Sequence, residues 1–272
     1  MCLPGRVVRK YQIHLIWKAN YDIITNGGSL TIQEIHYSDG DDKLKGLLVR
    51  NGDSSHHSPG ILVVHGGAGL DSHAEQQARR FAALGYIAFA CDMYGEAVVG
   101  RRDRILACIG ELRADRQRLC RRAQAGLDVL ATQPQAAPRI AVVGYCFGGL
   151  VALELARGGM NVDAVVSVHG SLTTAQAAQA GTVKARILAC HGARDPHSPP
   201  AQVSAFIDEM NEASADWQLV VYGGAMHGFT HQDARGQTPG VLYDARADSR
   251  SSADIRVFLE DALGSESRTS IT

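Results

Sequence analysis

Residues 142–149 read Val-Val-Gly-Tyr-Cys-Phe-Gly-Gly, and this run constrains the fold more than any other part of the chain. An apolar segment that ends in Gly-x-Cys-x-Gly is typical of a buried strand that turns sharply into a helix, with a nucleophile at the turn. Such a turn holds its central residue, here Cys146, at a positive φ, and Gly144 and Gly148 leave room for the helix to pass close to the strand. The N-terminus of the helix favours a thiolate over a thiol. The alternative is an ordinary strand-to-helix turn with a buried structural cysteine.

The segments around this turn alternate between short apolar runs and longer stretches with a helical pattern. Runs such as 60–64 and 140–143 are continuously apolar, which is typical of strands buried on both faces. Their alternation with helices predicts an α/β fold, with a mostly parallel sheet of about eight strands and helices on both faces. We expect a long helix over 103–131, broken near Gly110, and a short helix over 173–180. A chain of 272 residues that is 45% hydrophobic is large enough for one such domain.

The two ends of the chain differ from this pattern. Residues 1–29 carry early Lys and Arg, a short apolar segment and a Gly-Gly turn. We expect them to be an N-terminal appendage, either a leader that is not native to the protein or a genuine first strand. The α/β domain is predicted over residues 30–264, and the polar residues 265–272 are predicted to be a flexible tail.

Composition and charge argue against several classes of function. The net charge of -1 gives no field that would recruit nucleic acid or an anionic membrane, and no run of 18 apolar residues provides a membrane span. The six cysteines are scattered without a Cys-x-x-Cys, which favours reduced thiols and a cytoplasmic protein. The Arg-rich stretch 101–122 also holds acidic residues, so we interpret it as a solvated, salt-bridged helix face. The histidines form no His-x-His or His-Glu-x-x-His, so we predict no metal and no cofactor.

Reactive side chains follow three of the predicted strands. Cys146 comes first, Asp195 follows the apolar run 185–190, and His227 follows the run 218–222. Because the carboxyl ends of parallel strands meet at one edge of a sheet, we expect these three side chains to lie close together. Nucleophile, acid, base is also the chain order of α/β-hydrolase triads. Asp195 would fix the tautomer of His227, and His227 would take the thiol proton or pair with the thiolate.

A Gly-rich segment, His-Gly-Gly-Ala-Gly at 65–69, follows the first of the buried runs. Acyl transfer needs two N–H groups aimed at the developing oxyanion. We predict that the backbone amide of Phe147, directly after the nucleophile, supplies one of them. Gly67 is predicted to supply the other, since a glycine lets the backbone approach the substrate. The alternative is that 65–69 is only a flexible turn.

Taken together, these motifs resemble those of the dienelactone hydrolase family. The resemblance covers about residues 30–264. It implies the α/β-hydrolase fold and a metal-independent hydrolase with a Cys–Asp–His triad. The motifs that carry it are Gly-Tyr-Cys-Phe-Gly-Gly at 144–149, His-Gly-x-x-Asp at 191–195, Ala-Met-His-Gly-Phe at 225–229 and Asp-Met-Tyr at 92–94.

Three positions depart from the pattern of the family members that act on dienelactone. Those members carry a Glu that helps to activate the cysteine, where this chain has Gly66. They also carry two Arg that grip the substrate carboxylate, where this chain has Glu96 and His231. A site without both Arg, and with an added carboxylate, would repel an acidic substrate. The departures predict that Cys146 is activated by His227 and the helix end alone, and that the substrate is a neutral ester, lactone or phosphotriester.

The phosphotriester has a chemical rationale. A neutral triester has no negative oxygen that would repel a thiolate, and attack at phosphorus develops an anionic oxygen that the same two amides can hold. A serine enzyme often stalls as the phosphoryl-enzyme, whereas the more labile S–P bond would let a cysteine enzyme turn over. The expected substrate pocket comprises an apolar wall and the polar residues around it: Tyr94, Phe147, Met226 and Phe229, with His65, Gly66, Glu96 and His231.

We therefore predict a hydrolase of carboxylic esters that works through a covalent cysteinyl intermediate, with promiscuous phosphotriester hydrolysis. It would act on small molecules as a monomer or homodimer. The alternative is a non-catalytic binding protein or redox sensor on a hydrolase scaffold, with Cys146 as a peroxide-sensitive thiol. A burst of leaving group that is lost in Cys146→Ala distinguishes the two.

Overall fold

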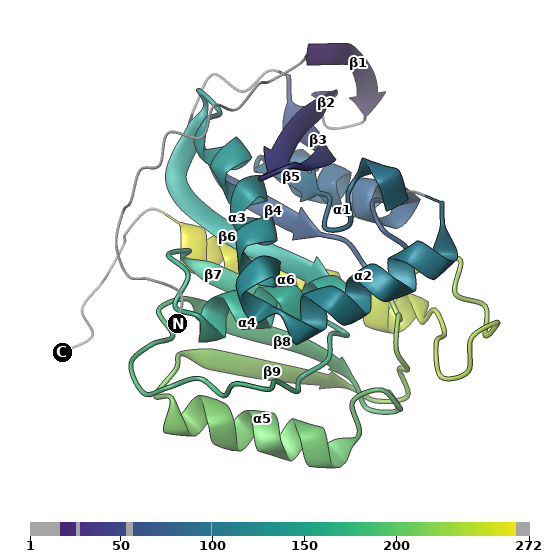
Figure 1. Ribbon diagram of the computed structural model, residues 1–272, viewed down its shortest axis with the longest axis vertical. Coiled ribbons are helices and arrows are strands. Elements are labelled where there is room, and N and C mark those ends of the chain that lie inside the picture. The colour runs from purple at the N-terminus through teal and green to yellow at the C-terminus, as the bar shows by residue number, and fades with distance from the viewer. Residues whose placement is uncertain (1–16, 26–27, 53–56, 99, 265–272) are drawn as a thin grey trace.

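The computed structural model describes residues 17–25, 28–52, 57–98 and 100–264 (Figure 1). Within these residues the strands form a single sheet of nine, in the order β1-β2-β3-β5-β4-β6-β7-β8-β9. The first three pair antiparallel at one edge, and all pairs from β5 to β9 are parallel. The strands are β1 (Trp17–Thr25), β2 (Gly28–Asp39), β3 (Asp42–Asn51), β4 (Ser58–Val64), β5 (Ile87–Cys91), β6 (Ala136–Tyr145), β7 (Ala164–Val168), β8 (Arg186–Gly192) and β9 (Trp217–Tyr222).

Helices cover both faces of this sheet, so the predicted α/β fold is confirmed. Helices α1 and α6 pack on one face, while α3, α4 and α5 bury their apolar residues on the other. Figure 1 shows α3 and α4 in front of the sheet and α6 behind it. Two covered faces explain why the central strands are continuously apolar. The helices are α1 (Ser72–Ala83), the short η1 (Glu96–Val98), α2 (Arg102–Ala114), α3 (Arg116–Ala131), α4 (Phe147–Arg157), α5 (Pro200–Glu212) and α6 (Ala245–Leu263).

Strand β1 lies in the segment 1–29 that the sequence separates from the domain. It pairs antiparallel with β2 and forms the edge of the sheet. It is also the ninth strand, beyond the eight counted from the sequence. Residues 1–16 and 26–27, and the tail 265–272, lie outside the described residues.

Two helix predictions were wrong. The stretch 103–131 is broken at Asp115 rather than near Gly110, because the Asp115 carboxylate accepts a hydrogen bond from the Arg118 N–H and caps a new helix. Segment 173–180 is not helical. There the Thr174 hydroxyl bonds the backbone of Gln176, an alternative to the helical pattern.

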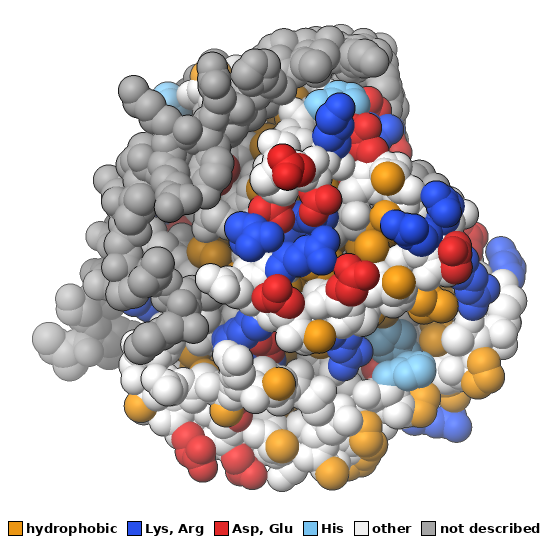
Figure 2. Space-filling model, viewed as in Figure 1, with side chains coloured by type: hydrophobic (Ala, Val, Ile, Leu, Met, Phe, Trp, Pro, Cys, Tyr) orange, Lys and Arg blue, Asp and Glu red, His pale blue; other side chains and the backbone are white. Residues whose placement is uncertain are grey.

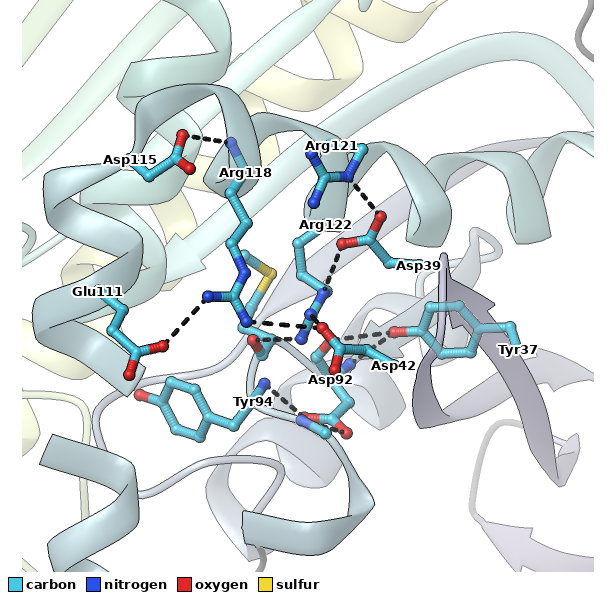
Figure 3. Close-up of polar contacts among 12 residues, drawn as sticks. Tyr37, Asp39, Asp42, Asp92, Tyr94, Glu111, Asp115, Arg118, Arg121 and Arg122 are labelled. Atoms are coloured by element: carbon cyan, nitrogen blue, oxygen red, sulfur yellow. Dashed lines mark hydrogen bonds and ion pairs between the residues drawn. The ribbon is translucent and has the colours of Figure 1, made fainter. Parts of the chain in front are cut away.

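The Arg-rich stretch 101–122 forms ion pairs in its second half, through Arg116, Arg118, Arg121 and Arg122, and it is not wholly solvated. Arg122 is only 2% exposed and donates to Asp39, to Asp42 and to the carbonyl of Met93 (Figure 3). The interpretation of the whole stretch as a solvated face is therefore wrong at Arg122. This buried cation fastens α3 to the β2–β3 turn and to the loop that follows β5, and removing one partner of such a pair is costly.

Candidate active site

The turn from β6 to α4 has the strained geometry that the Gly-x-Cys-x-Gly pattern predicts. Cys146 lies at the turn with φ 54° and ψ -112°. A Cβ on Gly144 would lie 1.8 Å from the carbonyl oxygen of Gly148, and a Cβ on Gly148 would lie 2.2 Å from the carbonyl oxygen of Val64. The two glycines therefore allow α4 to start directly against the strands. This close approach presents Cys146 at the carboxyl end of the sheet.

His227 lies between Cys146 and Asp195. Its Nε2 is 3.0 Å from the Cys146 Sγ, and its Nδ1 donates to Asp195 Oδ2 at 2.9 Å. Asp195 follows β8 and is 4% exposed, and its Oδ1 accepts from the backbone N–H of His197 at 2.8 Å. Neighbouring parallel strands β8 and β9 deliver the acid and the base side by side. The three predicted residues thus meet in the geometry of a nucleophile, a base and an orienting carboxylate.

Electrostatics favour a thiolate–imidazolium pair at this position. Burial by itself raises the pKa of Cys146, but the hydrogen bond and charge of His227 and the N–H groups of Gly67 and Phe147 outweigh it, and the net pKa lies below the ordinary value. Burial likewise lowers the pKa of His227, yet its bonds to Asp195 and Cys146 raise it to well above the ordinary value. Opposite shifts on two bonded partners favour the form in which the proton lies on His227 instead of Cys146.

The two amides predicted for the oxyanion hole both lie at the sulfur of Cys146. The backbone N–H groups of Gly67, in the loop after β4, and of Phe147, in the first turn of α4, both lower the pKa of Cys146, so they stabilise negative charge on its sulfur. An oxygen on an atom bound to this sulfur would lie within reach of the same donors. The position of Gly66 is also informative, because a Cβ there would lie 3.5 Å from the Cys146 Cβ. A longer side chain at 66 would therefore reach the thiol.

Tyr94 lies behind this loop rather than in the wall of the pocket. Its side chain is 8% exposed, and its hydroxyl donates to the carbonyls of Gly66 and Gly67, at 3.3 and 3.4 Å. Its ring contacts Phe147, with the centroids 5.7 Å apart. Tyr94 itself belongs to the loop that follows β5. Asp92 fixes the start of that second loop by accepting a hydrogen bond from the Tyr94 N–H at 2.8 Å (Figure 3). The tyrosine thus supports both residues whose amides face the sulfur.

Removing the Tyr94 hydroxyl should loosen that support. We expect Tyr94→Phe to lower kcat for a neutral ester by about 10-fold, with KM changed less than about 3-fold, because an amide that is misdirected weakens the transition state more than the bound substrate. Steady-state kinetics would measure both constants. Tyr86→Phe, which removes a hydroxyl at the opposite end of β5, is the matched control. An unchanged kcat in Tyr94→Phe would contradict this role.

A cavity of about 950 Å³ opens above Cys146, and five of the predicted residues line it: Gly67, Cys146, Phe147, His227 and His231. We call it the Cys146 cavity. In Figure 2 it corresponds to the hollow below α2, where histidine side chains reach the surface. His231 lies in its wall and pairs with Asp71 across 3.3 Å.

The other predicted pocket residues do not line this cavity. Of the four residues expected to form its apolar wall, only Phe147 does so. Glu96 turns outward and bonds His36 at 2.7 Å. His65 is fully buried, donating to the Gly66 carbonyl and accepting from the Met93 N–H. Phe229 is a core residue packed against Tyr222. Met226 and Gly66, like Tyr94, are not among the residues that line the Cys146 cavity.

The sequence reasoning missed the side chains of α2. Ile105, Leu106 and Ile109 form apolar wall in the Cys146 cavity, and Arg102 and Arg113 reach it from the two ends of the helix. The i, i+4 spacing of Ile105 and Ile109 was a usable signal of an apolar stripe. What it could not indicate is that the stripe faces a cavity instead of the core.

A buried polar chain behind the turn was also missed. The Cys146 N–H donates to His169 Nδ1 at 3.2 Å, so the ring carries its proton on Nε2 and donates to the Thr230 hydroxyl at 2.8 Å. The Thr230 hydroxyl in turn forms a hydrogen bond with His73 Nε2, at 3.0 Å. Burial lowers the pKa of His73 to about 4 and that of His169 well below its ordinary value. Both rings therefore stay neutral beside the imidazolium of His227.

Within the described residues, no group of three or more His, Cys, Asp or Glu side chains is arranged to hold a metal ion. None of the helices in the described ranges has the combined length and apolar character needed to cross a membrane.

Comparisons with known proteins identify relatives of this chain. Residues 44–263 match the model of the dienelactone hydrolase family. A solved dienelactone hydrolase-like promiscuous phosphotriesterase, P91 from metagenomic libraries, is 37% identical, with a TM-score of 0.82 over 86% of this chain and 99% of that chain. The solved structure m3DLH is 34% identical, with a TM-score of 0.81 over 86% and 98%. An uncharacterized protein of Caenorhabditis elegans is 34% identical over 52% of this chain and 92% of its own length.

Proposed function

This chain belongs to the dienelactone hydrolase family, and on that premise we propose that it hydrolyses neutral carboxylic esters and lactones through a covalent intermediate on Cys146. The observation that carries the proposal is the position of His227, bonded to Cys146 Sγ on one nitrogen and to Asp195 on the other. A thiolate is the reactive form of cysteine, and this arrangement stabilises it.

The first half of the reaction forms a thioester. The Cys146 thiolate attacks the carbonyl carbon, a C–S bond forms, and the electron pair of the C=O bond moves to oxygen, which the N–H groups of Gly67 and Phe147 stabilise. The C–O bond then breaks, and His227 transfers its Nε2 proton to the leaving alkoxide. The products are a free alcohol, an acyl-thioester and a neutral His227.

The second half returns the enzyme to its starting state. Neutral His227 removes a proton from water as the water oxygen attacks the thioester carbon. The C–S bond breaks, the carboxylic acid leaves, and the thiolate–imidazolium pair is restored. Asp195 keeps the ring of His227 in one tautomer through both halves and stabilises its cation.

A neutral substrate is supported by what surrounds the sulfur. Gly66 and Glu96 contribute no positive charge to the Cys146 cavity, and the two arginines of α2 that reach it are exposed to solvent, which screens their charges. A carboxylate beside the reacting carbon would be repelled by the thiolate, and the adjacent cation, His227, is already paired with that thiolate and with Asp195. We expect an ester with a carboxylate next to the carbonyl to have a kcat/KM at least about 10-fold below that of its uncharged amide analogue.

Phosphotriester hydrolysis is proposed as a secondary activity of the same site. It is supported by the 37% identity to the phosphotriesterase P91 and by two amide donors that would hold a phosphoryl oxygen as well as an acyl oxygen. The sensor alternative is supported only by the lowered pKa of Cys146. A sensor would need neither the Asp195 pair nor the oxyanion donors.

A burst experiment tests the hydrolase. Stopped-flow mixing with excess p-nitrophenyl acetate should release one p-nitrophenolate per protein in a fast phase, followed by steady turnover, with an acetyl group on Cys146 in quenched samples by mass spectrometry. Absence of both burst and turnover would overturn the proposal and favour the sensor. A burst without turnover would overturn hydrolysis while retaining the nucleophile.

The pH profile of kcat/KM should be a broad bell. The pKa of Cys146 lies below its ordinary value and that of His227 above it, so the reactive pair persists through neutral pH. Activity should fall on the acid side as the thiolate is protonated, and on the alkaline side as His227 loses the proton that the leaving group needs. A profile that rises with a midpoint near the ordinary thiol pKa of about 8.5 would contradict the preformed pair.

A further inference from the structure

The Cys146 cavity has two chemically different walls. The wall formed by the β4 loop, α2 and α4 is mostly apolar and contains Ile105, Leu106, Ile109, Phe147 and Leu150. Its charged residues, Arg102 and Arg113, lie at the two ends of α2. The wall formed by the segments after β7, β8 and β9 is mostly polar: Ser171, Thr173, His197, Gln202, Asp233, Gln237 and Thr238. Figure 2 shows apolar side chains along α2 above the hollow.

The sheet order separates these two walls. Cys146 follows β6, and β4 and β5 lie on one side of β6 while β7, β8 and β9 lie on the other. Gly67 and α2 belong to the first side, where a Cβ on Gly67 would lie 3.9 Å from Ile109 Cδ1. His227 belongs to the second side, where its ring meets that of His197, with the centroids 4.9 Å apart.

The chemistry then orients an ester. The leaving oxygen must reach the proton on His227, so the alcohol group lies on the β8–β9 side, against the polar wall. The oxyanion lies at the amides of Gly67 and Phe147. The remaining substituent of the carbon under attack is the acyl chain, and the apolar surface left for it is the wall of α2. A fully apolar leaving group would instead desolvate Gln202, Gln237 and Thr238 without replacing their hydrogen bonds.

We propose that the preferred substrates are esters of a large apolar acid with a small polar, hydroxyl-bearing alcohol, with the acyl chain lying along α2. This inference rests on the proposed hydrolase function. A volume of about 950 Å³ accommodates an acyl chain of six or more carbons together with the alcohol. Leu106 is 62% exposed in this structure, and burying it against a bound chain would add to the affinity.

Two isomeric esters test the orientation. 2-Hydroxyethyl hexanoate has an apolar acyl group and a polar alcohol, and hexyl glycolate exchanges those characters at the same composition. After division by the hydroxide-catalysed rate of each ester, kcat/KM should favour the hexanoate by at least about 10-fold. An equal or reversed preference would overturn the inference while leaving the hydrolase intact. Failure to turn over either ester or p-nitrophenyl acetate would instead overturn the proposed function.

Variants of α2 test the assignment of the wall. Ile109→Trp should lower the ratio of kcat/KM for p-nitrophenyl hexanoate over p-nitrophenyl acetate by at least about 10-fold, because the indole fills the space of the longer chain. Leu106→Ala, which changes an exposed side chain and no core contact, should lower the same ratio by about 3-fold. Val257→Trp adds an indole to an exposed position on α6 and is the control. Equal ratios in all three variants and the wild type would overturn the assignment.

Discussion

Cys146→Ala is expected to remove the burst and to lower kcat for p-nitrophenyl acetate by at least about 10⁴-fold, because it removes the sulfur that His227 bonds and that forms the proposed covalent intermediate. The fold should be unaffected, since alanine is smaller than cysteine and tolerates the same turn no worse. Burst amplitude, steady-state rate and thermal unfolding would be measured on the same preparation. Cys108→Ala, on α2 but outside the Cys146 cavity, is the matched control and should retain the burst.

Cys146→Ser examines why the chain uses a thiol. A hydroxyl cannot share its proton with His227 as an ion pair, so the base must be neutral before attack, and the residual esterase activity should rise with pH instead of following a bell. With a neutral phosphotriester, the serine variant should give one equivalent of leaving group and then stop, whereas the wild type should turn over. Continued turnover by the serine variant, or a stoichiometric stop by the wild type, would contradict the proposed advantage of the S–P bond.

Gly144→Ala is expected to lower the free energy of unfolding by about 3 kcal/mol or more and to lower kcat/KM by at least about 10²-fold. The added methyl would lie 1.8 Å from the carbonyl oxygen of Gly148, so the first turn of α4 must move away from β6. That turn carries both the nucleophile and the Phe147 amide, and a displacement of about 1 Å is enough to spoil their alignment. Urea unfolding and steady-state kinetics would measure the two effects.

The control for this effect is a glycine with open space around it. Gly110 lies in exposed helix α2, and a Cβ there would meet nothing within 4 Å. Gly110→Ala should leave the free energy of unfolding unchanged or raise it by about 0.5–1 kcal/mol, through helix propensity. Equal stabilities for the two variants would contradict the claim that close backbone packing, rather than glycine itself, is what matters at position 144.

Local patterns carried most of the fold and the centre of the site. The apolar runs at 60–64 and 140–143 indicated strands buried on both faces, and they lie within β4 and β6, at the middle of the sheet. The glycines around Cys146 indicated a turn in which the helix passes close to the strand. A Cβ on Gly148 would lie 2.2 Å from the carbonyl oxygen of Val64, which confirms the close approach. These features depend on residues near one another in the chain, or on the rule that parallel strands end at one edge.

Other features depended on contacts between distant segments. Tyr94 could have faced the substrate, but its hydroxyl bonds the carbonyl of Gly66 from behind. Glu96 could have entered the pocket, but a histidine of β2, 60 residues earlier, binds it on the outside. The partner of a charged or aromatic side chain is a residue that the tertiary structure places next to it, and that residue cannot be identified from the sequence alone.

The sequence by itself thus determined the α/β architecture, the turn at Cys146 and the order of Cys146, Asp195 and His227, because hydrophobic periodicity and glycine sterics are short-range. Only the tertiary structure decided that α2 covers the site. Its Ile105, Leu106 and Ile109 would suit a core or a cavity equally well, since burial of apolar area carries no direction. The position of the neighbouring helix α3 decides that these residues face a cavity. The cap at Asp115 sets where α3 begins, and the ion pairs of Arg122 hold α3 in place.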